Sequence, residues 1–182
     1  MKLFKRASSG FQPVAGQRFA DEHYESHLEE WLFNNPQLIG DDILMIGRQV
    51  MTDDGKRIDL LAVDKEGNTV IIELKRGEST RDLVGQINEY ISAVERWDER
   101  ELERRTKHQP RTLDKRYSER FNCAAPATFN HKQKAIVIIE SVDELTRSTV
   151  RRQGSRVLTF SYLTSTEEEY ILVDDIVSNP AP

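Results

Sequence analysis

Two apolar runs joined by a polar turn constrain the fold of this chain more than any other feature. They are RIDLLAV and TVIIELK, which flank a turn around Gly67 in the stretch 57–77. Short apolar runs separated by such a turn are typical of an antiparallel β-hairpin. Both of its faces are largely apolar, which predicts central strands covered on both sides. The same strands nevertheless carry Asp59, Glu73 and Lys75, and charges inside a covered sheet need a reason.

The turn predicts which charged residues face each other. If it is centred on Glu66, the position numbers of paired residues add up to 132, so Asp59 lies opposite Glu73 and Arg57 opposite Lys75. Directly opposed residues on antiparallel strands have Cβ atoms about 4.5–5.5 Å apart on one face. Alternation assigns the other face to apolar side chains, namely Ile58, Leu60, Val70, Ile72 and Leu74.

Asp59 and Glu73 would repel each other at this distance unless a positive group lies between them. A divalent metal fits, because hard cations such as Mg²⁺ take one or two carboxylates and keep positions for water and phosphate oxygens. Lys75 would then stabilise charge on a scissile phosphate or help to activate the attacking water. The alternative is an ion-pair cluster at a solvated strand end, without chemistry. These residues alone leave both interpretations open.

The rest of the chain alternates helical and extended patterns. Helices are predicted over 22–34, from 80 to about 105, and in the stretch that ends at Gly154. Strands are predicted at 42–50, 57–63, 69–75, 134–140 and 156–163. A strand, a helix and a strand in succession imply a parallel crossover. We therefore expect an α/β fold whose mixed central sheet combines an antiparallel meander with a parallel crossover, flanked by helices.

The expected organisation is a single domain. Residues 1–20 lack periodicity and should form an extended N-terminal segment, while 21–178 should form the domain, with a polar, basic insertion at about 106–133. The lone cysteine, Cys123, excludes an internal disulfide. No apolar run approaches the roughly 18 residues of a membrane span, and the start of the chain lacks the apolar stretch of a signal peptide. We expect a cytoplasmic protein without a membrane partner.

Charge is distributed unevenly along the chain. The net charge is −5, yet the stretch 104–120 carries seven basic and two acidic residues, a balance of +5. Such a segment can bind phosphate groups, although a charge run is also commonly a solvated face.

Several motifs resemble a known family. Asp59, a gap of 13 residues and then ELK at 73–75 resemble the core of the PD-(D/E)xK nucleases, with isoleucine in place of the proline before the aspartate. QINEY supplies Gln86 and Tyr90, similar to the Q-x3-Y motif of several branches of that superfamily. Upstream, YESHLEEWLFNNPQLIGDDILMIGRQV resembles the first helix and strand of the C-terminal nuclease domain of NucS/EndoMS-type DNA endonucleases. The resemblance covers about 21–95 and implies a restriction-endonuclease-like fold.

The resemblance also implies a metal site. Asp59 and Glu73, with the carbonyl of Leu74, would hold Mg²⁺ or Mn²⁺. A glutamate early in the first helix completes this site in the family. Alignment of the leucines places it at Glu25, with Glu29 one turn later as the alternative.

Further residues take implied roles in phosphodiester hydrolysis. Lys75 would position the nucleophilic water, and Gln86 would orient Lys75 or the substrate phosphate. The residues expected to contact nucleic acid are Arg57, Arg76, Tyr90, Arg104, Arg105, Arg111, Lys115 and Arg116. Tyr90 is equally compatible with core packing, because it lies next to an apolar stripe.

The sequence therefore predicts a metal-dependent nuclease, foremost a DNA endonuclease of repair, restriction or phage defence. RNA is the alternative substrate, and a homodimer or a partner protein from a defence or repair system is compatible with the sequence. The competing class is a catalytically silent module that binds nucleic acid or protein on the same fold. The joint presence of Glu25, Asp59, Glu73 and Lys75 favours the enzyme.

Overall fold

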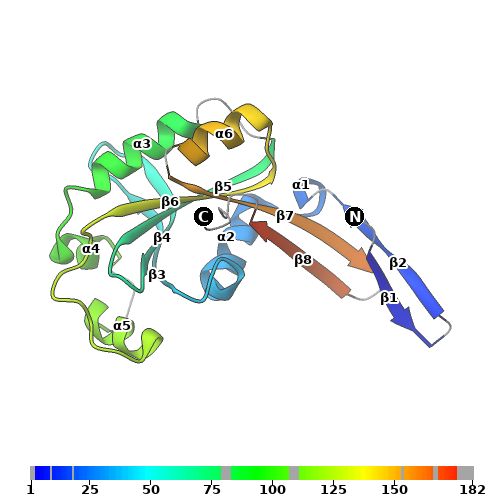
Figure 1. Cartoon of the computed structure of the whole chain (residues 1–182), viewed down its shortest axis with the longest axis horizontal. Helices are drawn as coiled ribbons and strands as arrows, with labels where there is room; N and C mark the ends of the chain where they lie inside the picture. Colours follow the sequence, from blue (N-terminus) through cyan, green and yellow to red (C-terminus); the bar gives the residue numbers. More distant parts are fainter. Residues whose placement is uncertain are drawn as a thin grey trace, which may run out of the picture.

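One mixed sheet organises the molecule (Figure 1). The computed structural model describes residues 3–8, 10–17, 19–78, 83–106, 111–152, 154–165 and 168–175. The strand order is β1-β2-β7-β6-β5-β4-β3, and β8 also pairs with β7. The strands are β1 (Leu3–Ala7), β2 (Gly10–Gln17), β3 (Ile43–Met51), β4 (Arg57–Asp64), β5 (Thr69–Glu78), β6 (Gln133–Ser141), β7 (Arg156–Ser165) and β8 (Glu168–Asp175).

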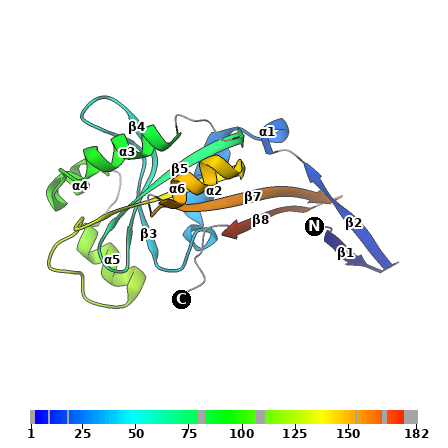
Figure 2. The same ribbon diagram turned by 45° about the horizontal axis from the view of Figure 1, so that its top comes forward.

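Helices cover both faces of the sheet (Figures 1 and 2). They are α1 (Phe19–Glu22), α2 (Glu25–Asn34), the 3-10 helix η1 (Pro36–Leu38), α3 (Leu83–Val94), α4 (Glu99–Arg105), α5 (Leu113–Phe121) and α6 (Glu144–Arg152). Strands β3, β4 and β5 form an antiparallel meander, whereas β5–β6 and β6–β7 are parallel pairs. The predicted α/β fold with a meander and a parallel crossover is confirmed.

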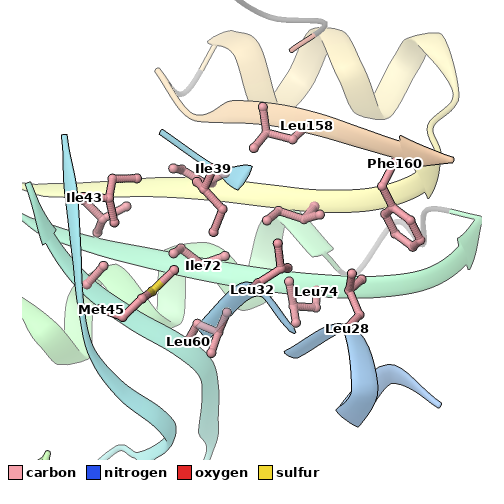
Figure 3. Packing of buried hydrophobic residues seen from close by; sticks show 14 of the residues in the cluster. Leu28, Leu32, Ile39, Ile43, Met45, Leu60, Ile72, Leu74, Leu158 and Phe160 are labelled. Atoms are coloured by element: carbon pink, nitrogen blue, oxygen red, sulfur yellow. The ribbon is translucent and has the colours of Figure 1, made fainter. Parts of the chain in front are cut away.

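Apolar side chains explain how the layers hold together. On one face, Leu28 and Leu32 of α2 pack against Leu60, Leu74 and their neighbours in the sheet (Figure 3). On the other face, α3, α4, α5 and α6 cover the sheet through two further clusters of buried side chains. Burial at roughly 25 cal/mol per Å² of apolar surface makes these clusters the main source of stability. The covered strands β4, β5 and β6 are accordingly almost continuously apolar, as expected for central strands.

The register of the predicted hairpin is correct over its regular part. The pairs from Val63 with Thr69 to Leu60 with Ile72 have position numbers that add up to 132, as a turn centred on Glu66 requires. The paired ladder then ends, so residues 57–59 are not held in register with β5 by backbone pairing.

One assignment of side-chain direction was wrong as a result. Ile58 packs with Leu61 and Val63 rather than on the face of Leu60. Strict alternation holds only while a strand is regular, and this part of β4 runs beside an irregular part of β3, where Gln49 has a positive φ of 48°.

Several elements differ from the predicted ones. The expected helix at 22–34 begins at Glu25, and α1 precedes it as a separate short helix. The helix expected from 80 to 105 is two helices, because α3 ends at Val94 and Asp98 caps α4 by accepting a hydrogen bond from Glu101 N at 2.8 Å. Residues 80–82 lie outside the described part of the chain. The segment 106–133 contains α5, a helix that was not predicted; that this segment is an insertion stays a prediction.

The N-terminal residues form strands that join the sheet. β1 and β2 pair with each other, and β2 pairs with β7 from Ala15–Thr164 to Gln17–Tyr162. β8, which was not predicted, pairs with β7 along its length. In Figures 1 and 2, β1 and β2 extend away from the helices. No helix in the described ranges is both long enough and apolar enough to cross a membrane.

Candidate functional site

Asp59 lies where β4 leaves the regular ladder with β5. Its Oδ2 accepts a hydrogen bond from Leu74 N at 2.9 Å, so a side chain replaces the backbone pairing that ends at Leu60. The N–H and C=O of one residue in an extended strand point to the same side, so the Leu74 carbonyl also faces β4. Asp59 is therefore held beside Glu73 and Leu74, which the sequence predicted to share a site with it.

Glu73 is the most deeply buried charged residue of the site, with 1% of its surface exposed. Its Oε1 accepts a hydrogen bond from Lys75 Nζ at 2.6 Å. Its Oε2 is buried and has no hydrogen-bond partner among the described residues. A buried acceptor without a partner costs free energy, and a proton or a bound cation would remove that cost.

The pKa values of Asp59 and Glu73 are both raised, because the two carboxyl groups are buried close to each other. Burial, and next the negative charge of Asp59, raise the pKa of Glu73 from 4.5 to about 7, although Lys75 acts in the opposite direction. Burial also raises the pKa of Asp59, while the hydrogen bond from Leu74 N partly offsets this effect. Burial alone would lower the pKa of Lys75, but its hydrogen bond to Glu73 and the surrounding negative charges outweigh burial and raise it. Lys75 therefore stays protonated.

Two glutamates of α2 lie near these residues and differ in their surroundings. The charge of Glu25, the first residue of α2, contributes to the raised pKa values of Asp59 and Lys75. Glu29 is 5% exposed, and its Oε1 accepts a hydrogen bond from Arg48 Nε at 2.8 Å. Glu29 is thus fixed by an ion pair, whereas Glu25 is partly buried at the start of α2, near the charges of the site.

Gln49 connects Glu29 with Asp59. Its Nε2 donates a hydrogen bond to Glu29 Oε2 at 2.7 Å and lies 3.3 Å from Asp59 Oδ1. Sequence reasoning missed both Gln49 and Arg48, because two consecutive polar residues at the end of a strand resemble a solvated strand end. No local signal marks this contact, which brings together α2, β3 and β4.

Gln86 and Tyr90 form a chain of hydrogen bonds that reaches β4. Gln86 Nε2 donates to the Tyr90 hydroxyl at 2.8 Å, and this hydroxyl donates to the carbonyl oxygen of Arg57 at 2.5 Å. Tyr90 is 3% exposed and belongs to the apolar cluster beneath α3. The structure therefore gives Tyr90 a place in the core, where it holds β4 two residues before Asp59.

The residues predicted to contact nucleic acid fall into different environments. Arg57 is exposed, and the side chain of Arg76 lies outside the described part of the structure. Lys115 is exposed on α5. The remaining arginines have partners within the protein: Arg104 pairs with Glu101, Arg111 with Glu119, Arg105 with Glu101 and Asp53, and Arg116 donates to the carbonyl of Met45.

Arg105 shows what these basic residues do for the fold. Its side chain is 8% exposed, and its guanidinium lies 4.4 Å from the centre of the Trp97 ring. Arg105 also donates to the carbonyl of Met51, so Arg105 and Arg116 connect α4 and α5 to β3. Part of the basic run therefore stabilises the fold. Contact between this segment and nucleic acid stays a prediction.

The site offers a metal ion few protein ligands. Within the described ranges, no group of three or more His, Cys, Asp or Glu side chains is placed to hold one. A metal at Asp59 and the free oxygen of Glu73 would therefore need the Leu74 carbonyl, water or phosphate as further ligands. Mg²⁺ and Mn²⁺ accept such a mixed oxygen shell, and the unpartnered Oε2 of Glu73 fits it.

The mixed central sheet, flanked by helices and carrying this site at the end of two central strands, defines an α/β protein. Residues 24–109, which include every site residue from Glu25 to Tyr90, match the family model described as the Endonuclease NucS C-terminal domain. The predicted resemblance to NucS-type nucleases is thereby confirmed.

Curated relatives align with this chain over about 70 residues. Endonuclease NucS of Pyrococcus furiosus is 34% identical over 70 residues, which are 38% of this chain and 26% of the relative. Endonuclease NucS of Mycobacteroides abscessus is 40% identical over 73 residues, which are 40% of this chain and 30% of the relative. The chain thus spans less than a third of the length of these relatives.

Solved structures of similar architecture include a repair endonuclease from Pyrococcus abyssi, with a TM-score of 0.49 and 20% identity over 75% of this chain and 46% of that one. The structure of an EndoMS–dsDNA complex gives a TM-score of 0.48 and 15% identity over 86% of this chain and 63% of that one.

Proposed function

We propose that this chain is a metal-dependent nuclease that hydrolyses phosphodiester bonds in DNA. The observation that carries the proposal is the buried Glu73, whose Oε2 lacks a partner among the described residues while Asp59 and Lys75 lie beside it. The names of the curated relatives and of the matching family support endonuclease activity. A setting in repair, restriction or phage defence stays a prediction from the sequence.

The protein would hold Mg²⁺ or Mn²⁺ through Asp59, Glu73 and the carbonyl of Leu74. When bound, the metal would polarise the scissile phosphate and lower the pKa of a water molecule. Asp59 and Glu73 supply the negative charge that recruits the cation, and the bond from Leu74 N keeps Asp59 turned toward β5. Glu25, which is close enough to affect the pKa of Asp59, would act on the metal through water or by its charge.

Lys75 would act as a hydrogen-bond donor rather than as a base. A lysine ammonium has three donors, of which one is used by Glu73 Oε1. Because the hydrogen bond to Glu73 and the nearby negative charges raise its pKa, Lys75 is protonated in the metal-free protein and is suited to donating hydrogen bonds. Its remaining donors would orient the attacking water or stabilise charge on a phosphate oxygen. Gln86 supports this arrangement indirectly, because it acts on Tyr90 and the start of β4.

The proposal is tested with plasmid and single-stranded DNA, each incubated with the protein in EDTA, Mg²⁺ or Mn²⁺. Glu73→Gln preserves the size of the side chain and removes its charge. Glu66→Gln is the matched control, since Glu66 lies in the turn of the same hairpin and pairs with Lys134. We expect metal-dependent cleavage that Glu73→Gln abolishes and Glu66→Gln retains. DNA binding without cleavage in every metal, and unaffected by Glu73→Gln, would instead support a silent binding module.

A further inference from the structure

The backbone of Gln49 is unusual for a residue within a strand. Its φ is 48°, in the left-handed region that residues other than glycine seldom adopt. Neighbouring residues pair regularly with β4, Arg48 with Leu60 and Val50 with Ile58. The left-handed conformation is thus confined to Gln49, with a paired residue on either side of it. Such strain persists where the surrounding structure enforces it, and it concentrates at functional sites.

This conformation determines where the side chain points. Consecutive residues of a regular strand direct their side chains to opposite faces. Arg48 and Gln49 nevertheless reach the same carboxylate, because Arg48 Nε donates to Glu29 Oε1 at 2.8 Å and Gln49 Nε2 donates to Glu29 Oε2 at 2.7 Å. The left-handed turn of the chain at Gln49 makes this shared contact possible.

The amide group of Gln49 also reaches the candidate metal site. Its Nε2 lies 3.3 Å from Asp59 Oδ1, while the other oxygen of Asp59 accepts from Leu74 N. Each oxygen of Asp59 therefore has a hydrogen-bond donor, Gln49 Nε2 for Oδ1 and Leu74 N for Oδ2. An amide suits this place, because it donates hydrogen bonds to two carboxylates without bringing a positive charge that would compete with a cation.

We propose that Gln49 is a positioning residue of the metal site, which fixes the carboxylate of Asp59 by anchoring it to Glu29 and Arg48. The inference rests on the proposed function, because it assigns Gln49 a role in preparing Asp59 for a metal ion. Groups that orient a metal ligand change metal affinity or activity by about 10- to 100-fold when removed.

The test uses substitutions that separate metal binding from folding. Gln49→Gly relieves the backbone conformation and deletes the amide, and it leaves no cavity because Gln49 is exposed. Gln49→Asn tolerates the left-handed backbone but has a side chain one methylene shorter, too short for both carboxylates. Asn122→Gly is the matched control, since Asn122 is exposed, has a φ of 51° and ends α5. Mn²⁺ affinity is measured by calorimetry on the DNA-free protein, together with Tm in EDTA and DNA cleavage.

We expect both Gln49 variants to bind Mn²⁺ about 10- to 100-fold more weakly than the wild type and to cleave DNA more slowly. Tm in EDTA should show that all three variants are folded, and only Asn122→Gly should keep the wild-type Kd for Mn²⁺. If Glu73→Gln loses Mn²⁺ while either Gln49 variant keeps a Kd within about twofold of the wild type, the role of Gln49 is refuted and the nuclease proposal stands. A wild-type protein that neither binds Mn²⁺ nor cleaves DNA refutes the proposed function, and the role of Gln49 with it.

Discussion

Replacing Glu73 with glutamine should stabilise the metal-free protein, and increasingly so as the pH rises. The pKa of Glu73 is raised from 4.5 to about 7 in the folded protein, so the folded state binds a proton that the unfolded state releases between these values. The contribution of Glu73 to the free energy of unfolding is therefore fully present below pH 4.5 and is lost as the pH rises through 7.

The size of the effect follows from the shift. Two and a half pH units at about 1.4 kcal/mol each correspond to about 3–4 kcal/mol above pH 7. Glutamine is neutral at every pH and so avoids this cost, but it loses the charged partner of Lys75. We expect Glu73→Gln to gain about 1–3 kcal/mol over the wild type at pH 8 and much less at pH 5.

The assay is urea denaturation of both proteins in EDTA between pH 5 and pH 8, with Glu66→Gln measured in parallel as a control for removing a carboxylate from the same hairpin. Mg²⁺ should stabilise the wild type at pH 8 and leave Glu73→Gln unchanged, because the variant lacks a ligand. A difference between Glu73→Gln and the wild type that stays constant or falls with pH would refute the assignment of a buried, destabilising carboxylate to Glu73.

Three further outcomes are expected. Tyr90→Phe removes the hydrogen bond to Arg57 O and should cost about 1 kcal/mol in urea denaturation, with unchanged DNA affinity; weaker DNA binding at unchanged stability would contradict its core role. Arg105→Ala should lower Tm, because it removes the ion pair with Asp53 and the contact with Trp97. Lys115→Ala should leave Tm unchanged. If α5 contacts DNA, Lys115→Ala should also reduce the slope of log K for DNA binding against log salt concentration by about one. Lys75→Met should slow cleavage about 100- to 1,000-fold without preventing DNA binding, and near-normal cleavage would remove Lys75 from the mechanism.

The part of the site that the sequence predicts is the part that depends on local rules. A turn centred on Glu66 determines the register of β4 and β5 as far as Leu60 and Ile72. Asp59 follows directly after this ladder and reaches Leu74 N, next to Glu73, with its side chain. The position of Ile58 was not predictable in this way. Alternation assumes a regular strand, whereas the ladder ends at Leu60 and the neighbouring strand is irregular.

Local sequence patterns do not predict contacts between elements that are far apart in the sequence. The ion pair of Glu29 with Arg48 joins α2 to β3, and nothing in either segment indicates the other. The basic run at 104–120 shows the same limit, because counting charges does not reveal that Arg105 lies over Trp97 and pairs with Asp53. β2 likewise contains Pro13 and two glycines, and it forms a strand because its last residues pair with β7.

Asp64 and Glu73 are two buried carboxylates of the same hairpin with different surroundings. Asp64 is 3% exposed, and both of its oxygens are satisfied by Asn68 and Lys134. Burial alone would raise the pKa of Asp64, but these hydrogen bonds outweigh it and lower the pKa. Glu73 is buried as deeply, yet one oxygen lacks a partner among the described residues and its pKa is raised.

An ion-pair cluster selected for stability would resemble the surroundings of Asp64. The candidate site instead combines an unpartnered buried oxygen at Glu73, repulsion between Glu73 and Asp59, and a left-handed backbone at Gln49. Each feature costs free energy in the folded protein, and all three lie around the same two carboxylates. A bound cation would give Glu73 Oε2 a partner and would relieve the repulsion between Glu73 and Asp59. The strained backbone of Gln49 would then serve to hold Asp59 where the cation would bind. The concentration of these costs at one point of the sheet therefore argues for a metal site rather than for a silent ion-pair cluster.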